Sequence, residues 1–194
     1  MADNPAKSGT QALLAQFDQI LSASPAVHFI LHSSGAGAAT LDWISDNLTA
    51  VTGYPLSVAL GDGWWQDNLH PDDRDRVVAA FAQLPQRGDV VCEYRFRFQQ
   101  SGYRWVRDQR RLSGMLAGGA YEAHGSWLDI SDIHSTQSRL HEREQLLRKI
   151  IETEPECVKL VDLSGHILEI NPAGLGMLQT ADPGEVIGSA VLSY

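Results

Sequence analysis

The sequence predicts an α+β domain in which a five-stranded antiparallel sheet carries short helices on one face. Three observations support this class. Two short apolar segments with a Ser/Gly-rich turn between them lie within residues 27–45, helical spacing dominates residues 46–84, and residues 92–130 contain three further strand-like segments. We expect an N-terminal helix before this domain, and a second helix with the beginning of another domain after it.

Residues 1–24 combine a loose tail with an amphipathic helix. After the tail, apolar residues recur at helical spacing and form one stripe: Leu13, Leu14, Phe17, Ile20 and Leu21. Ser24-Pro25 ends the helix, because the residue before proline avoids helical geometry. The stripe is larger than one sheet edge needs, so we expect it to contribute to a homodimer. The alternative is that this helix folds back onto its own sheet.

The first strands and helices follow in order. Val27–Leu31 and Thr40–Ser45 are predicted as a hairpin, and residues 46–53 as a short helix that ends at Gly53. His70-Pro71-Asp72-Asp73 begins a further helix, because proline is tolerated at the first helical position and aspartates favour the positive end of the helix dipole. Helical spacing continues to Pro85 through Val77, Val78, Phe81 and Leu84.

Three strands complete the predicted sheet. Apolar and polar residues alternate strictly over Cys92–Phe98, which places them on opposite faces of a strand. The returning strand begins at Tyr103–Arg107, and the last one spans residues 120–130 after a turn at 113–119. A basic cluster falls in these strands, and we expect it to form a solvated sheet face rather than an anion site: Arg95, Arg97, Arg104, Arg107, Arg110 and Arg111.

From Ser131 the chain is charged and helical. Ile133, Leu140 and Leu147 are one heptad apart, but the companion positions Thr136 and Arg143 are polar. Two interpretations stay open, namely a weak coiled coil that adds to the dimer and a single solvated connector helix.

The remaining residues repeat the opening of the first domain. Val158–Val161 and His166–Ile170 are predicted strands, and Asn171-Pro172 leads into an apolar helix that ends near Leu178. The closing strands are missing from this segment, and about 40 residues rarely fold alone. We therefore interpret residues 154–194 as a truncated domain.

Composition excludes several function classes. A net charge of -9 makes nucleic acid and anionic membrane surfaces poor partners. The two cysteines, Cys92 and Cys157, are far apart, which excludes a disulfide framework and indicates a reducing compartment. The first residues lack a secretory signal pattern, and no apolar run approaches the length of a membrane span. We expect a cytoplasmic protein.

Three motifs lie within residues 69–131: Leu69-His70-Pro71-Asp72-Asp73-Arg74, then Glu93-Tyr94-Arg95 with Gly102-Tyr103-Arg104-Trp105-Val106, and finally Gly125-Ser126-Trp127-Leu128-Asp129-Ile130-Ser131. Together they resemble the helix opening, the central hairpin and the closing strand of the PAS sensor family. Serine at 131 replaces the usual threonine. Residues 160–171 resemble the opening of a second PAS domain. The resemblance divides the chain into a PAS domain at 25–132, a signalling helix at 133–153 and the N-terminal part of a second PAS domain at 154–194.

The resemblance implies a small cavity under the sheet, used for ligand sensing, dimerisation or both. It also implies that the closing stretch Asp129, Ile130 and Ser131 passes the state of the sheet to the following helix. An ordinary helix cap explains the same side-chain oxygens, and the two roles are compatible. The residues that we expect in dimer or linker contacts are Leu13, Leu14, Phe17, Leu140 and Leu147.

Catalytic and metal chemistry find little support. The chain has no phosphate-binding glycine loop and no nucleophile elbow, so we expect no catalytic residues. A metal cluster could be drawn from His70, Asp72, Asp73 and Asp75, but helix-start physics explains these residues, and we predict no metal site.

The sequence requires no cofactor and identifies no ligand. A flavin photosensor needs a thiol in a helical motif, which is absent because Cys92 begins a strand. A haem would need a histidine aimed into the cavity, for which His28, His32 and His124 are candidates. Five tryptophans could stack on a planar ligand, although core or dimer packing is the commoner explanation: Trp43, Trp64, Trp65, Trp105 and Trp127.

The predicted function is the input region of a sensor histidine kinase in a phosphorelay, with a homodimer and a downstream output domain as partners. Two alternatives remain at this point. One is the input region of a cyclic-dinucleotide synthase or phosphodiesterase, and the other is a stand-alone dimerisation module.

Overall fold

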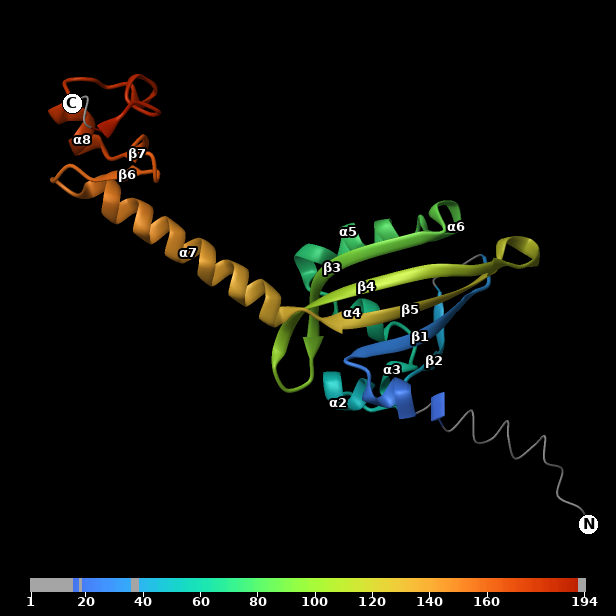
Figure 1. Cartoon of the computed structure of the whole chain (residues 1–194). Helices are drawn as coiled ribbons and strands as arrows, with labels where there is room; N and C mark the ends of the chain where they lie inside the picture. Colours follow the sequence, from blue (N-terminus) through green and yellow to red (C-terminus); the bar gives the residue numbers. More distant parts are fainter. Residues whose placement is uncertain (1–15, 18, 36–38, 192–194) are drawn as a thin grey trace, which may run out of the picture. The chain divides into compact units, whose positions relative to one another are not determined.

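The computed structural model describes residues 16–17, 19–35 and 39–191. The chain divides into two compact units, residues 1–134 and residues 135–194. Each is described separately below (Figure 1).

The first unit contains the predicted five-stranded antiparallel sheet. Its strands are β1 (Ala26–Ser33), β2 (Thr40–Ile44), β3 (Asp89–Phe98), β4 (Gly102–Met115) and β5 (Tyr121–Asp129). Their order across the sheet is β2-β1-β5-β4-β3, with antiparallel pairing throughout. The last strand thus lies at the centre, between the first hairpin and the β3–β4 hairpin.

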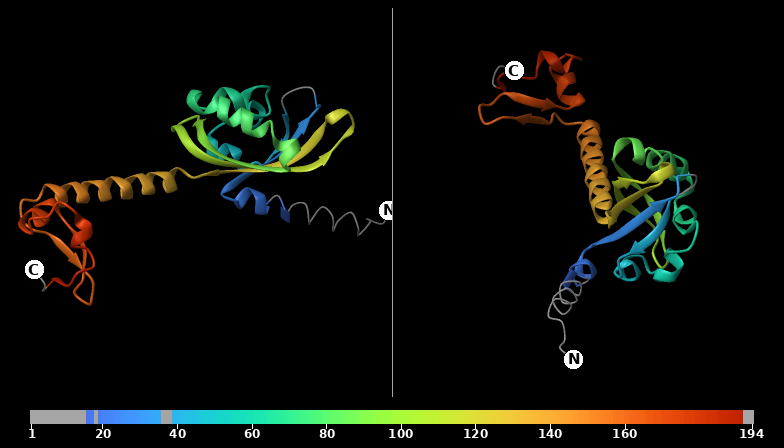
Figure 2. Two further views of the ribbon diagram at one scale, coloured as in Figure 1. Left: turned by 90° about the horizontal axis from the view of Figure 1, so that it is seen from above. Right: turned by 90° about the vertical axis from the view of Figure 1, so that its right-hand side faces the viewer.

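Five short helices cover one face of this sheet (Figure 2). They are α2 (Leu48–Thr52), α3 (Leu56–Ala59), α4 (Trp64–Asn68), α5 (Pro71–Phe81) and α6 (Leu84–Arg87). The alternation in β3 places Val90, Cys92, Tyr94, Phe96 and Phe98 on the covered face, where all are buried. Burial of this apolar face is the main source of stability for the unit.

The start of α5 confirms the predicted helix signal. His70 is the N-cap, and its Nδ1 accepts a hydrogen bond from the Asp72 backbone N–H at 3.2 Å. The helix ends at Phe81 rather than near Pro85, and Pro85 lies instead in the first turn of α6. Proline lacks the N–H that would continue the hydrogen-bond ladder of α5, but the first turn of a new helix does not need it.

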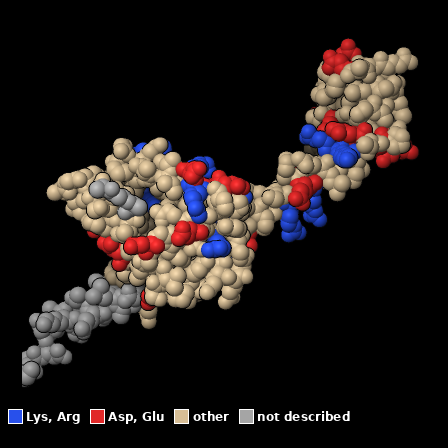
Figure 3. Space-filling view, turned by 180° about the vertical axis from the view of Figure 1, so that it is seen from behind, with Lys and Arg blue, Asp and Glu red and all other residues tan. Residues whose placement is uncertain are grey.

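The expectation of a solvated arginine face is wrong for Arg110. This side chain is buried, with 6% of the residue exposed, and it forms an ion pair with Asp108. The strand period explains the result, because Val106, Asp108 and Arg110 share the covered face of β4 while Arg107 and Gln109 point away. Arg97, Arg107 and Arg111 are exposed as expected. Acidic and basic side chains are interspersed on the face of the unit seen in Figure 3.

The second unit begins within α7 (Ser131–Thr153). It contains a two-stranded sheet of β6 (Lys159–Val161) and β7 (Ile167–Ile170), helix α8 (Pro172–Met177) and a 3-10 turn at Pro183–Glu185. Its buried apolar cluster is small and consists of Ile167, Ile170, Leu175 and Val186. Among the described residues, none of the helices is both long enough and apolar enough to cross a membrane.

Candidate functional site: a cavity and a strand-to-helix junction

A cavity of about 340 Å³ lies between the sheet and its helices in the first unit. Its lining includes Phe29, Leu31, Trp64, Trp65, Arg110 and Trp127. Three of these rings pack against one another, with centroid distances of 5.4 Å between Phe29 and Trp127 and 5.7 Å between Trp64 and Trp127. Concave, mostly apolar sites with a few fixed polar groups are typical places for small ligands.

A buried polar network supports one wall of the cavity. The Trp65 Nε1–H donates to the Tyr94 hydroxyl at 2.8 Å, and that hydroxyl donates to Asp108 Oδ2 at 2.7 Å. Arg110 donates to the same carboxylate from Nη2 at 2.7 Å and from Nε at 3.1 Å. The guanidinium carbon also lies 3.7 Å from the Phe81 ring centroid. The network fixes the position and plane of Arg110.

Electrostatics in this network follow from burial and from the Asp108 carboxylate. Burial, and then the nearby Asp108, raise the pKa of Tyr94 well above its ordinary value, so the hydroxyl stays a donor. Burial opposes the charge on Arg110, but the attraction of Asp108 outweighs it and raises the pKa of the guanidinium. Arg110 is therefore a guanidinium at neutral pH, paired with the Asp108 side chain.

Two buried donors belong to residues that line the cavity. The indole Nε1 atoms of Trp64 and Trp127 are buried, and neither has a hydrogen-bond partner in the described part of the chain. Buried polar groups are usually paired, so the two indoles stand out. From the sequence we considered these tryptophans as rings that stack on a ligand or pack in a core or dimer. The sequence did not indicate that their N–H groups would be unpaired.

None of the three haem candidates lines the cavity. His28 and His124 instead border a separate hollow with Gln109, Arg111 and Ser126. On β1 the buried Val27, Phe29 and Leu31 alternate with His28 and His32, so the two histidines point to the uncovered side. Within residues 16–17, 19–35 and 39–191, no group of three or more His, Cys, Asp or Glu side chains could hold a metal ion.

The second feature is the junction at Asp129, Ile130 and Ser131, where β5 runs into α7. Asp129 Oδ1 accepts from the Ser131 backbone N–H at 3.0 Å, and the Ser131 Oγ accepts from the Trp105 backbone N–H at 2.9 Å. The Ile130 N–H donates to the Trp105 carbonyl at 2.8 Å, and Ile130 is 2% exposed. The start of α7 is thus bonded across to β4.

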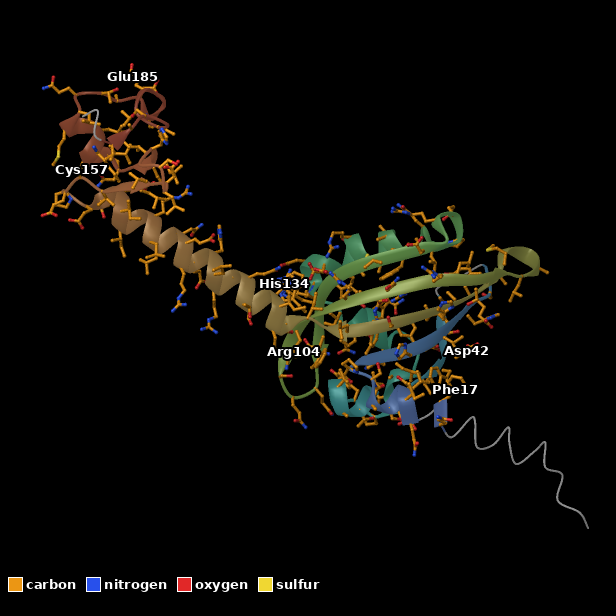
Figure 4. All side chains as sticks on the ribbon, in the orientation of Figure 1. Phe17, Asp42, Arg104, His134, Cys157 and Glu185 are labelled. Carbon is orange, nitrogen blue, oxygen red and sulfur yellow. The ribbon has the colours of Figure 1, made fainter. Side chains whose placement is uncertain are left out.

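Four side chains whose role here sequence reasoning missed strengthen this junction. Arg104 pairs with Asp129 at 2.9 Å, and Figure 4 shows Arg104 and His134 where the sheet meets α7. His134, in the first turn of α7, stacks on Trp105 with ring centroids 4.2 Å apart, and its Nε2 lies 3.2 Å from Glu93 Oε2. The sequence contained one signal for His134. It lies three residues after Ser131, so the two side chains are one helical turn apart on the same face of the helix.

The residues expected in dimer contacts are exposed wherever they are described. Residues 16–17 and 19–23 are helical, whereas Leu13 and Leu14 lie outside the described residues. Phe17 is 53% exposed, Leu140 58% and Leu147 60%.

The five-stranded sheet, the cavity under its helices and the bonded junction define an α+β sensory module. Residues 42–127 match the PAS fold family. The sensor protein FixL of Bradyrhizobium diazoefficiens is 30% identical over 150 residues, covering 72% of this chain and 30% of FixL. The two-component sensor PprA of Pseudomonas aeruginosa is 26% identical over 150 residues, covering 76% of this chain and 16% of PprA.

A solved sensory box histidine kinase/response regulator from Burkholderia thailandensis has the same fold, with a TM-score of 0.52 at 24% identity, over 69% of this chain and 98% of that one. The first unit of this chain is therefore a PAS sensory domain related to those of two-component sensors. It spans less than a third of the length of either sensor.

Proposed function

We propose that this chain is the cytoplasmic input region of a sensor histidine kinase that acts in a phosphorelay, and that α7 carries the signal toward the output domain. The observation behind the proposal is the bonded junction at Asp129, Ile130 and Ser131. The name of the relative PprA, a two-component sensor, supports an output of this kind. The chain itself supplies sensing and relay, and no residue of it is assigned a catalytic role.

The relay is mechanical in this proposal. Ser131 is held to β4 through the Trp105 N–H and to Arg104 at 3.3 Å, so a shift of β4 moves the first turn of α7. Glycine and proline are both absent between β5 and α7, so the connection is stiff. A stiff connection passes a small strand movement on as a shift or rotation of the helix, which a flexible linker would absorb.

We further propose that residues 154–194 open a second PAS domain. Asn171 directly follows β7, and its Nδ2 donates to the carbonyls of Ile151, Glu154 and Glu156 in the chain that enters β6. In the first unit, Asn47 follows β2, and its Nδ2 donates to the carbonyls of Ser24 and Ala26 where the chain enters β1. The same residue type thus makes the same type of bond at the same step of the chain path.

The proposal includes a homodimer formed through the N-terminal helix and α7. Exposed apolar side chains at Phe17, Ile20, Leu140 and Leu147 support it, because contiguous exposed apolar surface generally marks an interface. Light scattering of the wild type and of a Phe17→Glu/Ile20→Glu variant tests this part, and a monomeric wild type at micromolar concentration would exclude it.

The test of the relay uses the longer sensor protein that contains this chain, with autophosphorylation from ATP measured with and without stimulus. Inserting two glycines after Ser131 is expected to leave the PAS domain folded and to uncouple output from stimulus. Two glycines inserted after Gly118, in the exposed β4–β5 turn, are the matched control and are expected to leave regulation intact. Normal regulation in the Ser131 insertion would show that α7 is a passive spacer.

A further inference from the structure

The cavity of the first unit carries a chemical preference that can be derived from its walls. Phe29, Trp64 and Trp127 are among its lining residues, and the volume of about 340 Å³ falls within the range of small-ligand pockets. Flat apolar rings pack well against such a wall through offset or edge contacts. The wall therefore favours an aromatic ligand of one or two rings.

Arg110 adds one polar group at a fixed place. Among the described residues that line the cavity, it is the one cation. Its Nε and Nη2 are bonded to Asp108, and those bonds do not use Nη1. Because Phe81 and Trp65 hold the guanidinium plane at 3.7 and 4.4 Å, the remaining donor is preorganised.

Stability alone gives no reason to place such a pair beside a cavity. A buried ion pair often stabilises no better than apolar residues of similar volume, because both charges lose their hydration. An arginine that must present a donor to the cavity, however, needs a buried partner that neutralises it, and Asp108 at 0% exposure is that partner. The pair thus provides a donor with little net charge.

The charge balance decides between a neutral and an anionic ligand. A carboxylate beside Arg110 would leave two negative charges and one positive charge in a largely apolar site, which is costly. Asp62, an exposed carboxylate among the lining residues, adds repulsion. A carbonyl oxygen avoids both penalties and accepts from the guanidinium.

From these observations we infer that the cavity binds a small neutral aromatic compound whose carbonyl-type acceptor is recognised by Arg110. The inference rests on the proposed sensory function and specifies its ligand. The aromatic wall provides affinity through apolar contact, and the Arg110 donor selects among ligands of the same shape.

The test compares three probes of nearly equal shape by calorimetric titration of the 194-residue chain. Naphthalene-2-carboxamide is neutral and carries a carbonyl, naphthalene-2-carboxylate is anionic, and 2-ethylnaphthalene has no acceptor. We expect the carboxamide to bind at least about tenfold more tightly than the other two, as one hydrogen bond in a dry site predicts. Tightest binding of the carboxylate, equal binding of all three, or no binding at millimolar concentration would each overturn the inference.

The double variant Asp108→Asn/Arg110→Gln removes both charges together and keeps an acceptor for the Tyr94 hydroxyl. It is expected to bind the hydrocarbon as the wild type does and to lose the preference for the carboxamide. Arg111→Gln, on the exposed face of the same strand, is the matched control and is expected to keep that preference. An intact preference in the double variant would also overturn the assignment to Arg110. If the double variant does not fold, the three wild-type titrations still decide the ligand class.

This outcome is independent of the relay experiment. Failure of every probe alongside uncoupling by the Ser131 insertion would remove the ligand class and leave the sensory function standing. Selective carboxamide binding together with normal regulation in the Ser131 insertion would leave the ligand class standing and remove the proposed relay.

Discussion

In the first unit the β1–β2 hairpin pairs along β1 with β5, whereas in the second unit β6 and β7 form a two-stranded sheet to which residues 188–191 add backbone hydrogen bonds. Both hairpins are followed by an asparagine that reaches back to the chain entering the first strand. An inward side chain is covered in each unit, since Phe29 is 2% and Ile167 0% exposed. The difference lies in how much apolar surface stays uncovered, because Leu160 and Leu168 of the second hairpin are 56% and 51% exposed. A similar opening therefore becomes a full core only with closing strands.

The largest expected difference between the units is in hydrogen exchange. Amides in residues 90–130 lie in a sheet with a large buried face, so they exchange through opening of much of the unit. Amides in residues 159–170 depend on four buried apolar residues. We expect exchange at least about 100-fold faster in β6 and β7 than in β4 and β5, measured by mass spectrometry on the whole chain. Equal protection would mean that the second unit is stable without closing strands.

Asn47 and Asn171 test whether the first hairpins of the two units are held in equivalent ways. Asn47 makes two donor bonds, while Asn171 makes three and also accepts from the N–H groups of Val158 and Gly174. Replacing either one by alanine leaves buried backbone groups unpaired. For Asn47→Ala we expect a loss of about 2–3 kcal/mol in the unfolding free energy of the first unit. Urea titration followed by tryptophan fluorescence measures this, since all five tryptophans lie there.

For Asn171→Ala the same titration should be unchanged, while exchange in residues 158–175 becomes complete at the earliest time point. The second unit has too little buried surface to tolerate the loss of five hydrogen bonds. A shift of the first unit's urea midpoint in Asn171→Ala would contradict the independence of the two units.

Two aspartates offer a smaller test based on pH. Hydrogen bonding from Arg95 lowers the pKa of Asp73, which is 7% exposed and ties α5 to β3, with the Arg95 Nε at 2.9 Å. A carboxyl group whose pKa is lower in the folded than in the unfolded state stabilises the fold at pH values above the unfolded-state pKa. That stabilisation is lost as the pH falls through the folded-state pKa. Asp73→Asn should therefore cost about 1–3 kcal/mol at pH 7 and progressively less below about pH 4.

Asp162 is the matched control in the second unit. Backbone hydrogen bonds from His166 and then Ser164 lower the pKa of its carboxyl, but it lies in an exposed turn. Asp162→Asn should leave the unfolding of the first unit unchanged at every pH. Equal costs for both substitutions would show that the depth of burial does not govern these carboxylates.

The sequence predicted the sheet well, because strict alternation such as Cys92–Phe98 has only one structural explanation. The residue pattern placed the junction only through the family resemblance, since Asp129 and Ser131 alone indicate a helix cap. We predicted Arg110 on the solvated face because it is charged. The strand period of two from Val106 through Asp108 instead places it on the covered face of β4. The family resemblance implied a cavity, but its lining could not be predicted, because the wall gathers β1, β2, β4, β5 and the α3–α4 segment, which are distant in sequence.

The smallest expected effect concerns His134, the last residue of the first unit, through which α7 is attached to the sheet. His134→Ala removes both the stacking on Trp105 and the bond to Glu93, whereas His134→Phe keeps a ring and removes only the bond. Each contact is partly exposed, so we expect losses of about 1 kcal/mol or less, with alanine the more costly.

The Glu93 contribution has a defined pH dependence. Hydrogen bonding from Arg107, and to a lesser extent from His134, lowers the pKa of Glu93. Its stabilisation is thus present above the unfolded pKa and is lost as pH falls through the folded value. Exchange of the amides at 131–135, compared between pH 7 and a pH below about 4, should show the difference between wild type and His134→Phe shrinking, because Glu93 is protonated only once the pH falls below its lowered pKa. If His134→Ala and His134→Phe both matched wild type at both pH values, the first turn of α7 would depend on Asp129 and Ser131 alone. The helix would then be attached to the sheet by backbone and hydroxyl hydrogen bonds, without a contribution from the histidine.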